Sequence, residues 1–231
     1  MSVLLTHVPK TAGTSIRKSV FDHVVEDKDV HRFTGVRSAL KHGKSFKLLV
    51  GHYPYGVHWL YSMESPQYFV MLREPVDRAV SHYYFIQSCD TDSYQHPRLK
   101  DVKSRTLAGL YEMPEYQNMQ TCFVAGLSWQ LIGRQLNLNN VLGKYVLWRA
   151  KKNLLDSYQA FGLKERFDES VRIFATRAGT NPKAAERKHK KTPDRPSVAD
   201  LDASVVQSIR ANNTLDVALY EFAATQFENQ L

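Results

Sequence analysis

Continuous apolar runs and amphipathic stretches alternate along much of the chain. Four runs have the length and the β-branched, aliphatic or aromatic content of buried strands: residues 3–8, 46–50, 68–72 and 158–163. Unbroken apolar runs of this kind are typical of parallel sheets that are covered by helices on both faces. Helical spacing begins directly after the first run, at about Thr14 or Ser15, and after the third run, at Pro75. The pattern predicts an α/β fold, with a parallel sheet of about four to five strands flanked by helices.

The rest of the pattern is mainly helical, and the C-terminal half is predicted to be rich in helices. Further helices are predicted over residues 36–41, 107–112, 119–124, 129–136, 141–155, 165–177, 198–212 and 214–230. Residues 26–47 otherwise form a polar, basic connection, and residues 88–103 are polar without periodicity, which indicates a long surface loop. Because the chain shows no internal repeat and its 231 residues can bury one full core, we expect a single domain over residues 1–231.

The turn after the first run, with the sequence HVPKTAGTS at residues 7–15, indicates an anion-binding loop. A strand that turns directly into a helix aims unpaired backbone N–H groups and the positive end of the helix dipole at one point. Gly13 lets the backbone come close, Lys10 supplies a full charge, and hydroxyls come from Thr11, Thr14 and Ser15. The spacing differs from the P-loop pattern G-x-x-x-x-G-K-[ST], because here the lysine precedes the glycine. The alternative is an ordinary turn between a strand and a helix, in which Lys10 is solvated.

Residues that can bind an anion or accept a proton follow three of the predicted strands: Lys10, His52 and Arg73. Because ligands of open parallel sheets bind outside the carboxyl ends of the strands, we expect these three side chains to converge on one crevice. A guanidinium can grip a phosphate through two bonds, and an imidazole with a pKa near ~6.5 can take a proton from a hydroxyl. The alternatives are a surface ion pair of Arg73 with Glu74 or Asp77, and a His52 that only packs in a tight turn.

The charge balance favours anionic partners. The chain has 31 Lys and Arg against 23 Asp and Glu, a formal net charge of +8. Such an excess attracts nucleotides, nucleic acids, anionic glycans and membranes alike. Part of it lies in residues 178–196, which are rich in Gly, Pro and charge around the basic run 187–192. We interpret residues 178–196 as a mobile basic loop that covers an anionic ligand; the alternative is a solvated face or a nucleic-acid patch.

Cysteine content and hydropathy narrow the class of protein. The two cysteines, Cys89 and Cys122, have neither the spacing of a disulfide framework nor that of metal ligands. We therefore expect both cysteines to pack as small apolar residues in the core, and we expect no metal site. The N-terminal apolar run is too short for a signal peptide, and no stretch approaches the ~20 apolar residues that span a membrane. These features predict a soluble, cytoplasmic protein.

Two motifs together resemble those of a known enzyme family. The sequence HVPKTAGTS at residues 7–15 and the sequence LREPVDRAVSHYYF at residues 72–85 resemble the 5′-phosphosulfate loop and the 3′-phosphate motif of sulfotransferases. Enzymes of this family use 3′-phosphoadenosine 5′-phosphosulfate (PAPS), and the likeness is greatest to the carbohydrate branch that includes heparan sulfate 2-O-sulfotransferase. The Gly-His pair at residues 51–52 also matches, and weaker likeness covers most of the chain. Three features differ: Gly13 replaces a Ser, the middle loop is dissimilar, and the anchor of Golgi members is missing.

The resemblance implies a P-loop-NTPase-like fold and an O-sulfotransferase that moves a sulfuryl group from PAPS to a hydroxyl of a glycan or another acceptor, without a metal. His52 would be the base, and Lys10 would stabilise the leaving phosphate. Charge favours an acidic acceptor. The residues that would hold the donor are Lys10, Thr11, Ala12, Gly13, Thr14, Ser15, Arg73, Ser81, Lys190 and Thr192.

Other residues and other functions stay open. His58 and His7 are second choices for the base, whereas His82 is expected to pack or face solvent. Aromatic side chains that could stack on an adenine or a sugar are Trp59, Tyr83 and Tyr84. The alternative functions are an ATP- and Mg²⁺-dependent nucleotide kinase or hydrolase, and a non-catalytic binder of an anionic polymer. We expect neither a nucleic-acid nor a membrane partner.

Overall fold

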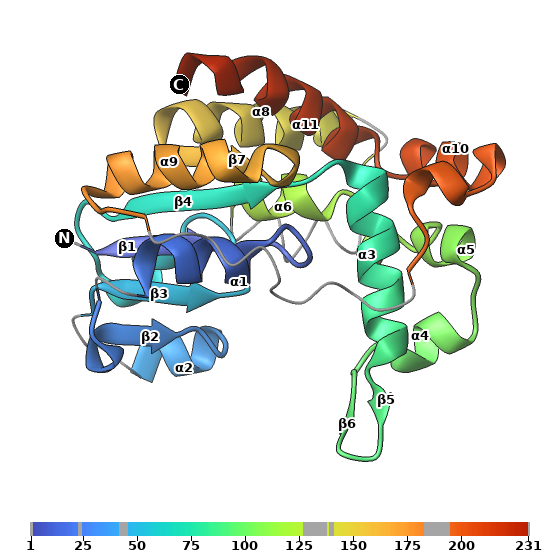
Figure 1. Cartoon of the computed structure of the whole chain (residues 1–231), viewed down its shortest axis with the longest axis horizontal. Helices are drawn as coiled ribbons and strands as arrows, with labels where there is room; N and C mark the ends of the chain where they lie inside the picture. The colour runs from blue at the N-terminus through green and yellow to red at the C-terminus, as the bar shows by residue number, and fades with distance from the viewer. Residues whose placement is uncertain are drawn as a thin grey trace.

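A five-stranded parallel sheet forms the centre of the molecule (Figure 1). The computed structural model describes residues 2–22, 25–41, 46–126, 138, 141–182 and 195–230. The strand order is β2-β3-β1-β4-β7, and all four pairings are parallel. The strands are β1 (Val3–Thr6), β2 (Val30–Arg32), β3 (Leu48–Gly51), β4 (Gln67–Leu72) and β7 (Tyr158–Leu163). The predicted α/β fold is confirmed.

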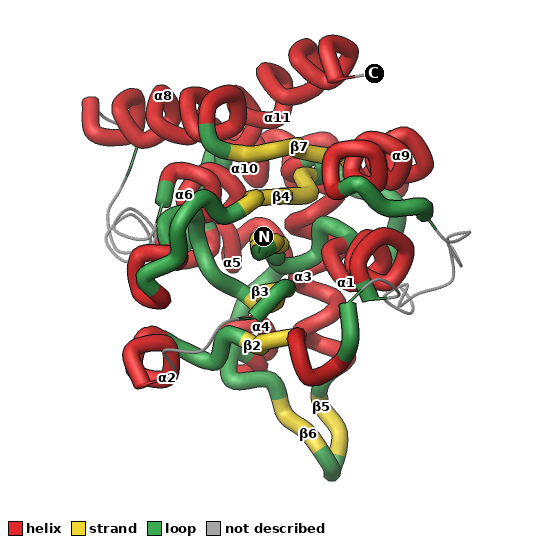
Figure 2. Tube along the Cα trace, turned by 90° about the vertical axis from the view of Figure 1, so that its left-hand side faces the viewer, coloured by secondary structure: helices red, strands yellow, loops and turns green. Residues whose placement is uncertain are grey.

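Helices cover both faces of the sheet (Figure 2). On one face lie α1 (Gly13–Ile16), which continues as a π-helix over Arg17–Phe21, and α9 (Phe167–Ala178). On the other lie α2 (Val36–Lys41), α6 (Met119–Ala125) and α8 (Val141–Asp156), while α11 (Thr214–Phe227) packs on α8 and β7. This double cover buries central strand residues such as Leu4, Leu48 and Phe69, which explains why the strands read as unbroken apolar runs.

A second, smaller hydrophobic cluster lies beyond the carboxyl ends of the strands (Figure 1). It is built by α3 (Pro75–Ser88), α4 (Leu99–Lys103), α5 (Leu107–Tyr111) and α10 (Ala203–Ala211). Val80, Leu110, Tyr111 and Ile209 are fully buried in it. A short hairpin of β5 (Asp90–Thr91) and β6 (Tyr94–Gln95) extends from α3. The carboxyl edge of the sheet therefore faces a second wall.

Several details of the sequence prediction were wrong. Residues 88–103 do not form a plain loop, because they contain the hairpin and α4. The helix predicted over residues 198–212 is broken into a 3₁₀ turn, Val198–Asp200, and α10, because a Ser197–Asp200 capping box closes the turn and Leu201 is extended. The edge strand β2 was missed inside the polar connection. Cys122 is buried as expected, whereas Cys89 is only partly buried. The helix predicted over residues 129–136 lies outside the described residues.

A network of buried polar groups joins the C-terminal helices to the end of β4. Gln120 accepts a hydrogen bond from the backbone N–H of Arg73 at 2.9 Å and donates one to its carbonyl at 2.8 Å. The fully buried Asp216 in turn accepts from the backbone N–H groups of Gln120 and Thr121 and from the Thr121 hydroxyl. The side chain of Arg78, also fully buried, supplies the nearby positive charge. The backbone of Arg73 is thereby fixed from α6.

We expect Asp216→Asn to destabilise the protein by about 3 kcal/mol or more. The change removes a negative charge near the buried Arg78 guanidinium and turns an NH₂ group toward N–H donors. Urea unfolding measures the loss, and Glu221→Gln, an exposed carboxylate of the same helix, should cost less than about 0.5 kcal/mol. A loss below about 1 kcal/mol for Asp216→Asn would show that the network does not depend on charge.

Candidate active site

The loop between β1 and α1 has a constrained backbone. Lys10 and Ala12 have φ values of 69° and 68°, in the left-handed region that non-glycine residues seldom adopt. The Thr11 hydroxyl donates to the carbonyl of Val8 at 2.9 Å and is buried, so this side chain supports the loop from inside. Strained backbone of this kind is concentrated at functional sites. The predicted anion-binding loop therefore has the close turn that such a site requires.

Gly13 is required by the side chain of His7. A Cβ atom at position 13 would lie 2.2 Å from the His7 Cδ2 atom, and Gly13 itself has no positive φ. The close approach of the backbone to an anion that we expected from this glycine stays a prediction, and space for the imidazole ring is a second requirement for glycine at this position. Burial, followed by the charges of His52, Arg17 and Lys10, lowers the pKa of His7 to about 3, so His7 is neutral at physiological pH.

His52 follows β3 and is oriented by the backbone of His7. The His52 Nδ1 atom lies 2.6 Å from the His7 carbonyl oxygen, and the two ring centroids are 4.6 Å apart. A carbonyl only accepts hydrogen bonds, so Nδ1 carries the proton, and in the neutral ring Nε2 has the free lone pair. His52 therefore presents a base nitrogen on a ring whose orientation is fixed.

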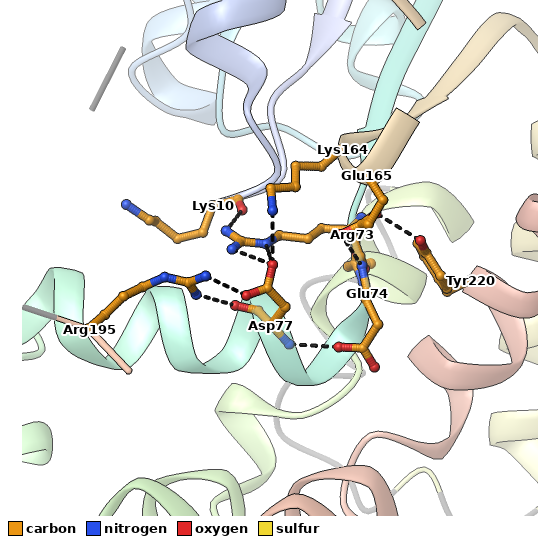
Figure 3. A network of polar contacts seen from close by, with 9 residues as sticks. Lys10, Arg73, Glu74, Asp77, Lys164, Glu165, Arg195 and Tyr220 are labelled. Carbon is orange, nitrogen blue, oxygen red and sulfur yellow. Dashed lines mark hydrogen bonds and ion pairs between the residues drawn. The ribbon is translucent and has the colours of Figure 1, made fainter. Parts of the chain in front are cut away.

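Arg73 joins the first loop to the start of α3 (Figure 3). Its Nη1 atom donates to the carbonyl of Lys10 at 2.9 Å, and its Nε and Nη2 atoms contact Asp77 Oδ2 at 2.7 and 2.5 Å. The ion pair with Asp77 that was open as an alternative is present, but it is not at the surface, since the Arg73 side chain is 7% exposed. Burial lowers the pKa of Arg73 against the opposing effect of Asp77, yet a guanidinium remains charged.

Asp77 contacts two further cations (Figure 3). Lys164, which follows β7, lies 3.1 Å from Asp77 Oδ2, and the Arg195 Nη2 atom lies 2.5 Å from Asp77 Oδ1. Arg195 also donates to the Asp77 carbonyl at 3.1 Å. Burial alone would raise the pKa of Asp77, but the charge of Arg73 and the hydrogen bonds from Arg195, Arg73 and Lys164 lower it to about 2. The carboxylate is ionised at neutral pH.

A cavity of about 1100 Å³ lies at the carboxyl edge of the sheet and is lined by Arg73, Lys164 and Arg195, but not by Asp77. This volume suits a nucleotide-sized ligand together with part of a second molecule. The predicted site residues that line it are Lys10, Ala12, Gly13, Thr14, Ser15, His52, Arg73 and Ser81. His7 and His82 line it as well, and His82 is buried rather than solvated. The expected convergence of Lys10, His52 and Arg73 is confirmed as geometry, while their roles stay predictions.

Other predicted residues lie elsewhere. His58 forms a hydrogen bond with the Tyr68 hydroxyl at 2.9 Å, and Trp59 is 64% exposed. Neither residue borders the cavity, and the same holds for Tyr83 and Tyr84. The Phe and Tyr rings that do border it are Phe85, Tyr116, Phe123 and Phe167. The centroid of the Phe85 ring is 4.1 Å from the Lys10 ammonium. Lys190, Thr192 and the rest of the basic run 187–192 lie outside the described residues.

Lys164 and Arg195 were missed from the sequence. Lys164 had a signal, because it directly follows a predicted strand of the parallel sheet, as Arg73 does. Arg195 lies within residues 178–196, which we interpreted as a basic loop over an anionic ligand, but no local pattern indicates its contact with Asp77 across 118 positions. His96 and Arg98, which lie in the predicted loop over residues 88–103, also line the cavity, as does Tyr116, which lies between two predicted helices. Lys164 and Arg195 both increase the positive charge of the site.

Comparison with known proteins gives the family. The sulfotransferase family pattern matches residues 1–223. This chain belongs to the sulfotransferase family. Heparan sulfate 2-O-sulfotransferase 1 of Pongo abelii is 23% identical to this sulfotransferase over an alignment of 266 positions. The alignment covers 99% of this chain and 71% of the relative. The protein of the same name from Gallus gallus is 24% identical over 263 residues, covering 98% and 70%. The resemblance inferred from the two motifs is confirmed, and so is the prediction that the protein is an enzyme of the sulfotransferase class.

Two negative findings concern only the part of the chain that the structure describes. None of its helices there combines the length and the apolar content needed to cross a membrane. No group of three or more His, Cys, Asp or Glu side chains there is arranged to hold a metal ion. The cytoplasmic location expected from the sequence stays a prediction.

We expect Gly13→Ala to destabilise the protein by about 1–3 kcal/mol, because the new methyl group overlaps the His7 ring. In a His7→Ala background the same change should cost far less, giving a coupling energy of at least about 1 kcal/mol. Thermal unfolding of the two single variants and the double variant measures it. If the losses of stability in the two single variants were additive in the double variant, the His7 ring would not be the reason for glycine at position 13.

The ion pairs of Asp77 should also appear in the pH dependence of stability. The folded-state pKa of about 2 lies below the value of about 3.9 for an unfolded aspartate, so the contribution is present above pH ~4 and is lost as the pH falls toward 2. Wild type should exceed Asp77→Asn by about 1–2 kcal/mol at pH 6, and the difference should shrink by pH 3. Urea unfolding at both pH values tests this. A difference that stays constant or widens in acid would contradict it.

Proposed function

We propose that this enzyme transfers a sulfuryl group from PAPS to a hydroxyl of a glycan. The observation that carries the proposal is the hydrogen bond from Arg73 Nη1 to the Lys10 carbonyl, which joins two anion-binding motifs at one cavity. PAPS carries two separate anionic groups, a 5′-phosphosulfate and a 3′-phosphate. A site with two linked cationic ends matches such a donor better than it matches a single phosphate.

The donor's 5′ end belongs at the loop of residues 10–15. Backbone N–H groups at the start of α1, the hydroxyls of Thr14 and Ser15 and the Lys10 ammonium can together bind a phosphosulfate. Its 3′-phosphate belongs at Arg73 and Ser81, which line the same cavity. We retain Lys190 and Thr192 as further donor ligands from the family resemblance alone.

The reaction is an in-line displacement at sulfur. A bond forms from the acceptor oxygen to sulfur while the bond from sulfur to the bridging phosphate oxygen breaks, which leaves adenosine 3′,5′-bisphosphate. The acceptor proton passes to Nε2 of His52, whose Nδ1–H is held by the His7 carbonyl. The Lys10 ammonium neutralises the charge that grows on the leaving phosphate oxygen. Positioning and charge stabilisation supply most of the rate enhancement, as in phosphoryl transfer.

The acceptor is an acidic glycan in this proposal. Both relatives described above are named for heparan sulfate, and the net charge of +8 favours a polyanion. His96 and Arg98 also line the cavity and can contact a carboxylate or sulfate of such a chain. The position that is sulfated is left open.

Binding of adenosine 3′,5′-bisphosphate should raise the melting temperature by about 5–10 °C at a concentration near 100 Kd. Lys10→Ala and Arg73→Ala should each remove most of that rise, because each deletes one cationic end of the site. Lys152→Ala, an exposed lysine paired with Asp156 on α8, is the matched control and should leave the rise intact. No rise with the bisphosphate or with PAPS in the wild type would refute the donor assignment.

His52→Ala should lower kcat/KM by about 10²–10⁴-fold, since the base is lost. The bisphosphate should still bind to this variant. His58→Ala, whose ring bonds to Tyr68 away from the cavity, serves as the control and should change kcat/KM less than about threefold. Activity of His52→Ala within threefold of wild type would remove His52 from the role of base.

A further inference from the structure

An ionised carboxylate pairs with the cations of a site that we assign to an anion, although Asp77 itself does not line the cavity. Asp77 contacts three cations, which come from the end of β4, the end of β7 and the segment before α10: Arg73, Lys164 and Arg195. A carboxylate among phosphate ligands repels the phosphate directly. The presence of Asp77 therefore has to be explained, and the geometry of its three cationic partners explains it.

The cations keep hydrogen-bond donors for another ligand. A guanidinium has five N–H groups, and Arg73 uses three of them, two toward Asp77 and one toward the Lys10 carbonyl. Among the residues that the structure describes, this leaves one N–H on Nη1 and one on Nη2 without a hydrogen-bond acceptor. Lys164 uses one of its three N–H groups on Asp77, and Arg195 uses two of its five on this residue. Asp77 thus binds one side of each cation and leaves another side available.

Asp77 also balances charge. Three positive groups and one negative group leave a net charge of +2, which matches a phosphate dianion. Without the carboxylate, three mutually repelling cations would face one another at partly buried positions, with side chains 7%, 35% and 22% exposed for Arg73, Lys164 and Arg195. Long cationic side chains in that situation turn toward solvent. Asp77 is the group that keeps them together.

The neighbouring carboxylates have other partners. Glu74 accepts from the backbone N–H of Asp77 at 2.7 Å and pairs with Arg210 at 3.3 Å. Glu165 accepts from the backbone N–H of Glu74 at 3.2 Å and from the Tyr220 hydroxyl at 2.7 Å. Both are therefore held on their own hydrogen-bond partners, and Asp77 carries the organisation of the three cations.

We propose that Asp77 is a positioning residue that arranges Arg73, Lys164 and Arg195 around a single phosphomonoester group of the donor. Lys164 and Arg195 are then two phosphate-binding residues in addition to Arg73 and Ser81. The inference rests on the proposed function, because the phosphomonoester is the donor's 3′-phosphate.

The test compares two nucleotides that differ only in this phosphate. Calorimetry gives the Kd of adenosine 3′,5′-bisphosphate and of adenosine 5′-phosphate, and their ratio isolates the contribution of the 3′-phosphate. Asp77→Asn should lower the preference for the bisphosphate at least tenfold while changing the Kd of adenosine 5′-phosphate less than threefold. Asp156→Asn, which removes the carboxylate of the exposed Lys152 pair on α8, should change neither. General damage to the fold would weaken both nucleotides together.

The opposite sign would overturn the inference. If Asp77 only competes with the phosphate, Asp77→Asn raises the preference for the bisphosphate, and an unchanged preference equally excludes positioning. Lys164→Gln and Arg195→Gln should each lower the preference for the bisphosphate at least threefold. If Asp77→Asn does not fold, an unchanged preference in these two variants would overturn the inference. Wild-type protein that binds neither nucleotide would instead refute the proposed function itself.

Discussion

The hydrogen bond from Arg73 Nη1 to the carbonyl of Lys10 connects the two halves of the site. Parallel strands bring the residues after β1 and β4 to the same edge, but they leave the loops free to adopt many shapes. The left-handed backbone at Lys10 turns its carbonyl toward Arg73, and the guanidinium stabilises that strained conformation. One buried contact thus sets both the shape of the loop and the distance between the two anion-binding ends.

Support for this contact comes from distant parts of the chain. Gln120 on α6 fixes the backbone of Arg73 through two hydrogen bonds, and Asp216 on α11 fixes α6. Asp77 holds the guanidinium from α3. The C-terminal helices therefore do more than cover the sheet, because they set the position of a residue at its carboxyl edge.

Strong local patterns made much of this structure predictable. Apolar runs that are buried on both faces identify β1, β3, β4 and β7, and the strand-end rule brings Lys10, His52 and Arg73 to one cavity. The edge strand β2 escaped detection because only three residues, Val-His-Arg, form it, and two of them are polar. The short elements within residues 88–103 form because the hairpin and α4 pack on α3, and no local periodicity encodes that packing.

Contacts over long sequence distances account for the parts of the site that were missed. The pairing of Asp77 with Arg195 depends on how the chain returns to α3 after more than a hundred residues. Gly13 illustrates a different limit, since its residue type indicated a close approach of the backbone to an anion, and only the three-dimensional contacts show that the His7 ring excludes a side chain there. Sequence motifs predict which residues bind a ligand, and the three-dimensional contacts show how those residues are held.

The central claim is sulfuryl transfer between PAPS and an acidic glycan at this cavity. Its most direct test is incubation of the purified enzyme with PAPS labelled in the sulfate group and a panel of unsulfated glycans, both uronic-acid-containing and neutral. The account predicts stoichiometric appearance of labelled glycan and adenosine 3′,5′-bisphosphate, with uronic-acid polymers preferred. Release of labelled inorganic sulfate alone, or no turnover with any hydroxyl acceptor while PAPS stays bound, would contradict it.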